Sequence, residues 1–183
     1  MKIGVDFDKI FVSPPPLIPP SVIEMFYKKK NGSLSYRIPG AVEKKIRALS
    51  HSPFLRKPIR ENLDYVQKIS RKNPELYLVS SRFSFLKKET DIWFKKYGIG
   101  KYFKKTYFNY DDKQPHIFKD EMLKILHIDT FIDDDLDLLL YLSAHNPKIK
   151  FYFLTNKKVL PNRLPQNIKQ IYNLQEFYSN YLK

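Results

Sequence analysis

Short apolar runs alternate with amphipathic segments along most of the chain. The runs are Ile3 to Phe7, Leu76 to Val79, Thr106 to Phe108, Thr130 to Ile132 and Phe151 to Leu154. Residues 59–69, 86–97, 118–126 and 174–181 carry apolar side chains at helical spacing. Buried strands that alternate with amphipathic helices are typical of a parallel sheet covered by helices. We therefore predict an α/β fold, a three-layer, Rossmann-like parallel sheet with helices on both faces.

A proline-rich stretch interrupts this alternation after the first run. It contains Pro14, Pro15, Pro16, Pro19 and Pro20. Proline has no backbone N–H to donate, so regular structure is not expected here. Two helices are expected between this stretch and Pro58. We interpret residues 12–56 as a small helical cap insertion within a single domain that covers residues 1–183, a length that suffices for one core.

The composition restricts the possible chemistry. The chain has no cysteine, which excludes disulfides, cysteine-based zinc sites and thiol nucleophiles. Five glycines are present without a GxGxxG or P-loop motif, which disfavours dinucleotide-binding and P-loop sites. The sequence shows neither a secretory signal nor an apolar stretch of membrane-spanning length, so we expect a soluble, cytoplasmic protein without a membrane partner.

The net charge bears on the kind of partner. Thirty-three Lys and Arg against 19 Asp and Glu give a formal charge of +14, which favours anionic partners through the long-range field. The lysines are scattered over all the predicted helices instead of gathering in one segment. Nucleic acid is therefore a possible partner that is not favoured over a small phosphorylated molecule. The oligomeric state stays open.

Two carboxylates follow the first apolar run. Asp6 and Asp8 are two residues apart, so at the end of a strand both side chains leave the same face, while Phe7 points the other way. Ligands of open parallel sheets bind at the carboxyl ends of the strands. A DxD pattern by itself is equally typical of an acidic turn that closes a strand.

A second acidic segment follows the run Thr130 to Ile132. It contains Asp133, Asp134, Asp135 and Asp137, and like charges so close together favour a neutralising cation. An EF-hand loop read from Asp133 fails, because Leu138 stands where glycine is needed and Ala144 where glutamate is needed. Hard oxygen ligands suit Mg²⁺. Capping of the following helix explains part of the segment, though not every aspartate.

Two further positions fall beside predicted strands. Ser80, Ser81 and Arg82 end the second run and offer hydroxyls, backbone N–H groups and a guanidinium for an anion. Serine at this place is also an ordinary helix cap. Lys119 lies at the start of the helix that leads into the second acidic segment, where it could direct an ammonium to the sheet edge.

Taken in order, these sites resemble the motifs of the haloacid dehalogenase superfamily, in its phosphatase branch. The corresponding segments are IGVDFDKIF, LYLVSSR, HIFKDEMLKIL and TFIDDD, and the stretch from FYFLTN to NLQEFYSNYL resembles the last strand and helix of that family. The resemblance covers the chain except for the insertion. It implies a Mg²⁺-dependent phosphohydrolase related to small-capped, 5'-nucleotidase-like members.

The resemblance also implies a role for each matched residue. Asp6 would be the nucleophile that forms an aspartyl-phosphate, and Asp8 would protonate the leaving oxygen and then deprotonate water. Ser80 would bind a phosphoryl oxygen, and Lys119 would neutralise developing charge. The metal would be held by Asp6, Asp134 and the backbone carbonyl of Asp8, with Asp133 as a direct or indirect ligand. Ser81, Arg82 and Lys9 would contact the substrate, whereas Asp135 and Asp137 cannot be ranked.

The chain departs from the family pattern directly after Asp8. Lys9 and Ile10 stand where these phosphatases usually have a small residue followed by Thr or Val. Lys9 is expected either to crowd the turn or to extend a cationic pocket. The favoured function is phosphomonoester hydrolysis on a small metabolite, with a nucleoside monophosphate as the first guess. The alternatives are a polynucleotide phosphatase or end-processing enzyme, and a catalytically silent binding protein of the same fold.

Overall fold

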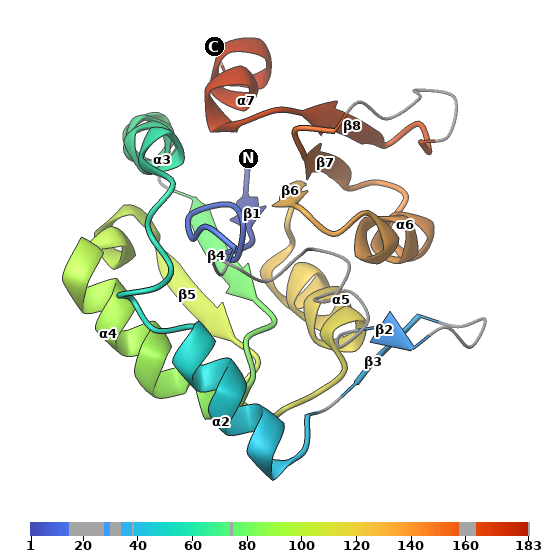
Figure 1. Cartoon of the computed structure of the whole chain (residues 1–183). Coiled ribbons are helices and arrows are strands. Elements are labelled where there is room, and N and C mark those ends of the chain that lie inside the picture. The colour runs from blue at the N-terminus through green and yellow to red at the C-terminus, as the bar shows by residue number, and fades with distance from the viewer. Residues whose placement is uncertain (15–27, 30–33, 38, 74, 158–163, 183) are drawn as a thin grey trace.

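A six-stranded parallel sheet forms the centre of the molecule (Figure 1). The strands are β1 (Ile3–Val5), β4 (Leu76–Ser80), β5 (Lys105–Phe108), β6 (Thr130–Asp133), β7 (Lys150–Leu154) and β8 (Ile168–Ile171). They lie in the order β5-β4-β1-β6-β7-β8, and every neighbouring pair is parallel. The computed structural model describes residues 1–14, 28–29, 34–37, 39–73, 75–157 and 164–182. The predicted α/β class with a parallel sheet is confirmed.

Helices cover both faces of the sheet (Figure 1). The helices are α3 (Arg60–Lys72), α4 (Lys87–Tyr97), α5 (Pro115–Leu126), α6 (Leu136–His145) and α7 (Leu174–Tyr181), with short 3-10 turns at η1 (Ser84–Leu86) and η2 (Ile99–Tyr102). One buried cluster joins Val66, Trp93 and Phe177 of α3, α4 and α7 to β1. A second joins Phe118 and Leu139 of α5 and α6 to β6 on the other face. The helical stripes of the sequence therefore face the core, except for Ile125 on α5, which is 67% exposed.

The central strand β1 is short and tightly packed. A side chain at Gly4 would place its Cβ 2.7 Å from the ring of Phe131 on β6, so only glycine lets that ring cover the strand. The strand ends at Val5, although the apolar run predicts it through Phe7. Strand β8 was not predicted, because its buried residues Ile168 and Ile171 are separated by two polar residues and form no continuous apolar run.

The segment interpreted as a cap contributes a small hairpin and a helix. Strands β2 (Lys28–Lys29) and β3 (Ser35–Tyr36) are antiparallel, and α2 (Ala41–Ser50) follows. Of the two helices expected there, α2 is described, whereas residues 15–27 and 30–33 lie outside the described residues. No helix in the described ranges is long and apolar enough to span a membrane.

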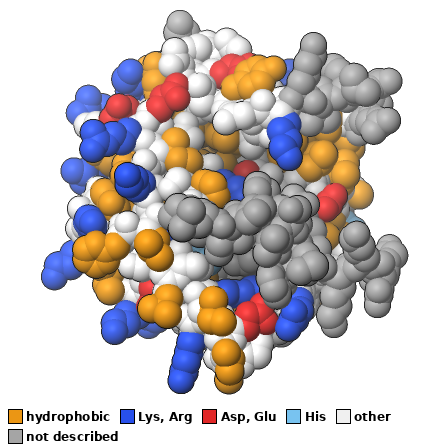
Figure 2. Space-filling model, viewed as in Figure 1, with side chains coloured by type: hydrophobic (Ala, Val, Ile, Leu, Met, Phe, Trp, Pro, Cys, Tyr) orange, Lys and Arg blue, Asp and Glu red, His pale blue; other side chains and the backbone are white. Residues whose placement is uncertain are grey.

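Helix α2 has an unusual orientation of its two faces. Its apolar residues Val42, Ile46 and Leu49 are 73%, 60% and 72% exposed, whereas Arg47 is buried, as is His51 at its carboxyl end. Figure 2 shows apolar side chains at the surface over this part of the molecule, with basic side chains among them. The helix therefore turns its polar face toward the sheet edge where the carboxylates lie.

Candidate active site

The acidic residues meet because three neighbouring strands end at the same level. Strand β1 lies between β4 and β6, with Val5 opposite both Leu78 and Ile132. The chain continues this register for one residue, since the Asp6 N–H donates to the Ile132 carbonyl at 2.9 Å. Asp6 and Asp133 therefore lie side by side at the carboxyl edge of the sheet, the edge where parallel α/β sheets bind ligands.

Lys119 contacts both of these carboxylates from the sheet face that α5 and α6 cover. It lies on α5 and is 3% exposed, and its Nζ is 2.9 Å from Asp6 Oδ1 and 2.6 Å from Asp133 Oδ2. Burial alone would lower the pKa of Lys119, but the Asp133 and Asp6 carboxylates outweigh it and raise the pKa above its usual value. The buried lysine is therefore a permanent cation between the two acids.

Asp134 completes an acidic cluster with Asp6 and Asp133. One carboxylate oxygen from each of the three residues lies within 4.8 Å of the others. Burial, with repulsion from Asp133 and Asp134 and against the attraction of Lys119, raises the pKa of Asp6 to about 8. Burial also raises the pKa of Asp134 to about 6, although Lys9 opposes this. Asp6 and Asp134 therefore hold a proton more readily than an exposed carboxyl group does.

This cluster fits a hard divalent cation. Its donors are carboxylate oxygens, which Mg²⁺ prefers, and three like charges held this close together favour a neutralising cation. Asp6 and Asp134 could supply oxygen ligands directly. Asp133 is already fixed, since it accepts from Lys119 through Oδ2 and from the Asp135 N–H through Oδ1 at 3.0 Å. It therefore orients the cluster.

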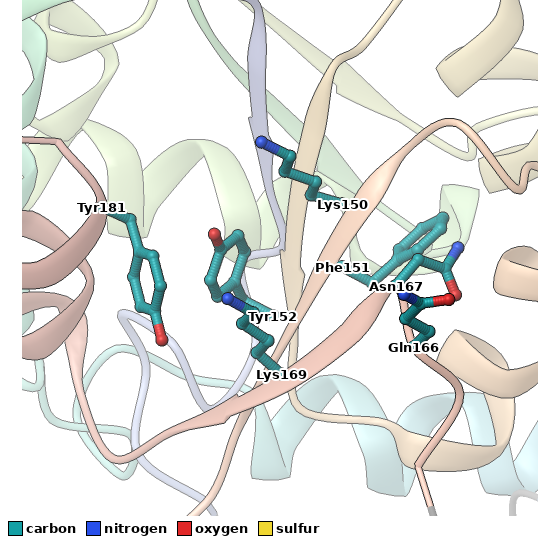
Figure 3. A pocket seen from close by; sticks show the side chains of 7 residues that line it. All are labelled: Lys150, Phe151, Tyr152, Gln166, Asn167, Lys169 and Tyr181. Carbon is teal, nitrogen blue, oxygen red and sulfur yellow. The ribbon is translucent and has the colours of Figure 1, made fainter.

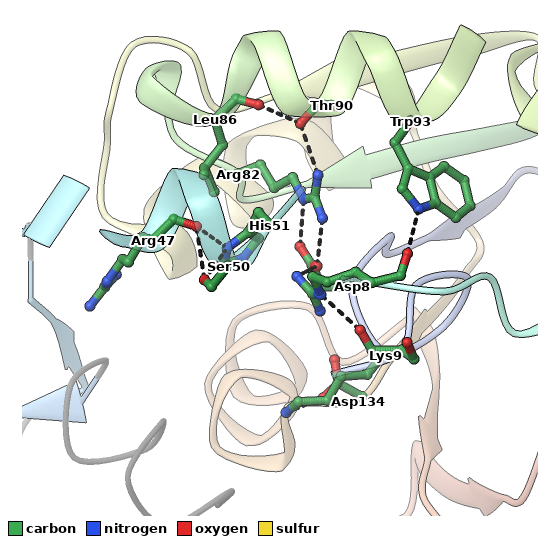
Figure 4. Close-up of polar contacts among 12 residues, drawn as sticks. Asp8, Lys9, Arg47, Ser50, His51, Arg82, Leu86, Thr90, Trp93 and Asp134 are labelled. Carbon is green, nitrogen blue, oxygen red and sulfur yellow. Dashed lines mark hydrogen bonds and ion pairs between the residues drawn. The ribbon is translucent and has the colours of Figure 1, made fainter. Parts of the chain in front are cut away.

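Asp8 belongs to a different network from Asp6. Arg82 binds it with two contacts, Nε to Oδ2 at 2.8 Å and Nη2 to Oδ1 at 2.9 Å (Figure 4). Arg56 Nη1 lies 2.6 Å from Oδ1. Both guanidiniums are almost fully buried. Burial would raise the pKa of Asp8, but Arg82 and Arg56 prevail and hold it well below its usual value. Asp8 is therefore ionised and paired in this arrangement.

The supports of Arg82 explain its fixed position. Its guanidinium carbon lies 4.5 Å from the centre of the Phe7 ring, and Nη1 donates to Thr90 Oγ1 at 3.0 Å. Arg82 was predicted to contact substrate, and the structure directs it to Asp8.

Ser80 is buried at the end of β4, and Ser81 Oγ is buried with no hydrogen-bond partner in the described part of the chain.

Lys9 and Asp135 lie on the other side of the cluster. Lys9 has a left-handed backbone, with φ of 54°, and its Nζ lies 2.8 Å from Asp134 Oδ2. It therefore places an ammonium group beside the cluster, and its expected contact with substrate stays a prediction. Asp135 caps α6 by accepting from the Asp137 and Leu138 N–H groups, and it also accepts from the Tyr36 hydroxyl at 2.9 Å. Asp135 thus has a structural role, and Asp137 is exposed.

Two residues of this site were missed by sequence reasoning. Arg56 is the last residue of the predicted insertion, and its Nε also donates to the Ser13 carbonyl at 2.7 Å. His51 is buried beside it, where burial and then Arg56 and Arg82 lower its pKa to about 3. Neither residue belongs to a recognisable motif, and Arg56 is one of 33 basic residues. The fold alone reveals them.

Comparisons with known proteins place the fold. No family model matches the sequence, and no curated protein matches it. A solved structure from Bacteroides fragilis, described as a haloacid dehalogenase-like hydrolase, is 10% identical with a TM-score of 0.65, over 96% of this chain and 98% of that one. A D,D-heptose 1,7-bisphosphate phosphatase from B. bronchiseptica, complexed with magnesium and phosphate, is 11% identical with a TM-score of 0.52, over 95% and 94%.

A third solved structure is larger than this protein. It is a dehalogenase with an intermediate complex, 11% identical with a TM-score of 0.55, and the match covers 69% of this chain and 57% of that one. In the first two structures the match covers almost the whole of this chain and of the matched chain. This chain therefore has the fold of the haloacid dehalogenase superfamily.

Proposed function

We propose that the chain is a Mg²⁺-dependent phosphomonoester hydrolase that acts through an aspartyl-phosphate on Asp6. The observation that carries the proposal is Lys119, whose buried ammonium contacts Asp6 and Asp133 at 2.9 and 2.6 Å. A cation fixed beside a carboxylate lets that carboxylate approach an anionic phosphoryl group without strong repulsion. The likeness to hydrolases, among them a phosphatase, supports the same reaction class.

The reaction divides between the residues of the site. An Asp6 carboxylate oxygen attacks phosphorus, the bond from phosphorus to the ester oxygen breaks, and the departing oxygen takes a proton. Water then attacks phosphorus, inorganic phosphate leaves, and the Asp6 carboxylate is restored. Lys119 offsets the negative charge in both steps. Mg²⁺, held by Asp6, Asp134 and the Asp8 carbonyl, would supply charge neutralisation at the phosphoryl oxygens when bound.

Asp8 is proposed as the residue that exchanges this proton with the leaving oxygen and with water. In the structure both of its oxygens are bound to guanidiniums, so the ionised carboxylate is ready as the base. Action as an acid requires at least one of these contacts to open. The substrate phosphate is itself an anion that a guanidinium binds well, which provides a competitor for Asp8.

The experiment is an assay of phosphate release from an aryl phosphate and a panel of phosphorylated metabolites. It is run with Mg²⁺, with EDTA, and with Asp6→Asn, and Asp64→Asn on the exposed face of α3 is the matched control. We expect activity that EDTA and Asp6→Asn abolish and that Asp64→Asn leaves intact. Phosphate release that survives either treatment contradicts the proposal.

One observation favours a second candidate, a catalytically silent binding protein. Every carboxylate of the site has a basic partner: Lys119 contacts Asp6 and Asp133, Lys9 contacts Asp134, and two arginines contact Asp8. Such pairing could hold the site together without turnover. Absence of phosphate release from the whole panel, together with an unchanged melting temperature on addition of Mg²⁺, would favour this candidate.

A further inference from the structure

A pocket of about 180 Å³ opens at the same sheet edge as the acidic cluster. Its walls include Lys9 from the loop after β1, Leu154 and Asn156 at the end of β7, Tyr172 after β8, and Glu61 at the start of α3. Strand β7 pairs with β6 so that Phe153 lies opposite Asp133. The pocket and the cluster therefore open at the same carboxyl edge of the sheet, at the ends of neighbouring strands.

Lys9 is the shared wall between the pocket and the cluster. Its side chain lines the pocket, and its Nζ contacts Asp134 at 2.8 Å. The left-handed backbone at Lys9 follows directly from the turn after Asp8, where the Lys9 N–H donates to the Val12 carbonyl at 2.9 Å. A phosphoryl group at Asp6 thus has a neighbouring space for the group to which it is esterified.

The pocket presents polar groups that have hydrogen-bonding capacity left over among the described residues. The Asn156 side chain is exposed and has no hydrogen-bond partner among the residues that the structure describes. Glu61 accepts from Asn173 Nδ2 through Oε1, which leaves Oε2 for another donor. The Tyr172 ring is 51% exposed at the rim. These groups are an amide that both donates and accepts, a carboxylate that accepts, and an aromatic surface.

We propose that this pocket binds the leaving group of the substrate, and that this group is neutral, rich in hydroxyls and no larger than a monosaccharide. A hydroxyl both donates and accepts, so it satisfies Asn156 and Glu61 together. The Glu61 carboxylate disfavours a second phosphate on the same group. The size excludes larger groups, because pockets for drug-sized ligands measure roughly 300–1,000 Å³. The assignment rests on the proposed phosphohydrolase function.

A second pocket of the described structure does not compete for this role. It measures about 170 Å³ and is lined by Lys150, Tyr152, Gln166, Lys169 and Tyr181, among others (Figure 3). Lys150 begins β7, and Gln166 and Asn167 precede β8, so this pocket lies at the amino ends of the strands. It opens away from Asp6 and supplies a matched control residue.

The test measures kcat/KM with Mg²⁺ for glucose 6-phosphate, ribose 5-phosphate, adenosine monophosphate and acetyl phosphate. We expect the sugar phosphates to exceed adenosine monophosphate at least tenfold. The acetate that leaves acetyl phosphate is too small to fill the pocket, so this substrate measures the activity of Asp6 without the contribution of the pocket. Asn156→Ala removes one hydrogen bond and should lower the ratio of sugar phosphate to acetyl phosphate activity about five- to tenfold. Gln166→Ala, an exposed amide in the other pocket, should leave the ratio unchanged.

The outcomes separate this inference from the proposed function. Asp6-dependent hydrolysis of acetyl phosphate with an unchanged ratio in Asn156→Ala, or with adenosine monophosphate preferred, overturns the pocket and keeps the phosphohydrolase. Absence of phosphate release from all four substrates overturns the proposed function. Binding is then measured by saturation-transfer NMR with glucose 6-phosphate. A signal in the parent protein that Asn156→Ala reduces supports the pocket, and its absence in both proteins overturns it.

Discussion

Arg56 Nη1 lies 2.6 Å from Asp8 Oδ1, and this contact ties the end of the predicted insertion to the loop after β1. The same side chain donates to the Ser13 carbonyl, and the Arg56 carbonyl accepts from Trp93 Nε1 at 3.2 Å. One buried residue thus links three segments that are far apart in the sequence. The insertion can therefore influence Asp8 without any contact between its own helix and a substrate.

Replacement of Arg56 by Gln should destabilise the protein by about 2–3 kcal/mol. The substitution removes a buried donor from the Asp8 carboxylate and from the Ser13 carbonyl, while Arg82 still pairs with Asp8 and limits the loss. Urea unfolding measures the change. Lys57→Gln is the control, because Lys57 is exposed and its loss should cost no more than about 0.5 kcal/mol. Equal effects of the two substitutions would contradict a role for the Arg56 contacts.

Mg²⁺ should raise the melting temperature, and more strongly at pH 8 than at pH 5.5. The pKa of Asp6 is raised to about 8 and that of Asp134 to about 6, so protons compete with the metal at the lower pH. Each kcal/mol of binding free energy should appear as about 2–4 °C for a chain of this size. Scanning calorimetry with MgCl₂ and with EDTA measures the shift. A shift of the same size in Asp134→Asn would rule out this site.

Without metal, Asp6 should make the folded state less stable as the pH rises. Its pKa is about 8 in the folded protein, against the usual 3.8 that applies to the unfolded chain. The unfolded chain therefore releases the proton first and gains stability as the pH increases from about 4 to 8. Asp6→Asn removes this dependence. Urea unfolding in EDTA should therefore show that the free energy of unfolding of the variant rises relative to that of the parent protein over that pH range. A difference that stays constant with pH would contradict the raised pKa.

The sheet and the acidic cluster could be predicted from sequence because both follow from local patterns. The runs that became β4, β6 and β7 are apolar, and strand ends in a parallel sheet meet at one edge, which brings Asp6 and Asp133 together. Lys119 reaches both carboxylates from α5. Strand β8 was not predicted, because an edge strand with two polar residues at its centre lacks the continuous apolar run that indicates a buried strand. The environment of Asp8 could not be predicted. The environment of Asp8 depends on the irregular path of the insertion, which brings Arg56 to the Asp8 carboxylate. It also depends on the tertiary structure, which pairs Arg82 with Asp8 and not with a substrate.

His51 should make the protein sensitive to acid. Its ring is buried, its Nδ1 lies 2.7 Å from the Arg47 carbonyl, and burial beside two arginines lowers its pKa to about 3. The unfolded chain takes up a proton below pH 6.5 while the folded chain does not, so acid favours unfolding. The free energy of unfolding of the parent protein should fall relative to that of His51→Gln by about 1.4 kcal/mol for each pH unit below about 6.5. Parallel curves for the two proteins between about pH 7 and pH 4.5 would contradict this.

The exposed apolar face of α2 should contribute almost nothing to stability. Ile46 is 60% exposed, so Ile46→Ser removes little buried surface and should change the free energy of unfolding by no more than about 0.5 kcal/mol. Ile69 on α3 is 1% exposed, and Ile69→Ala should cost about 2–5 kcal/mol through the lost contacts and the remaining cavity. Urea unfolding of both variants measures the contrast. A loss of more than about 2 kcal/mol in Ile46→Ser would mean that another part of the molecule covers this face in solution. Helix α2 would then contact the rest of the protein through its apolar side as well as through its polar side, which carries Arg47 and His51.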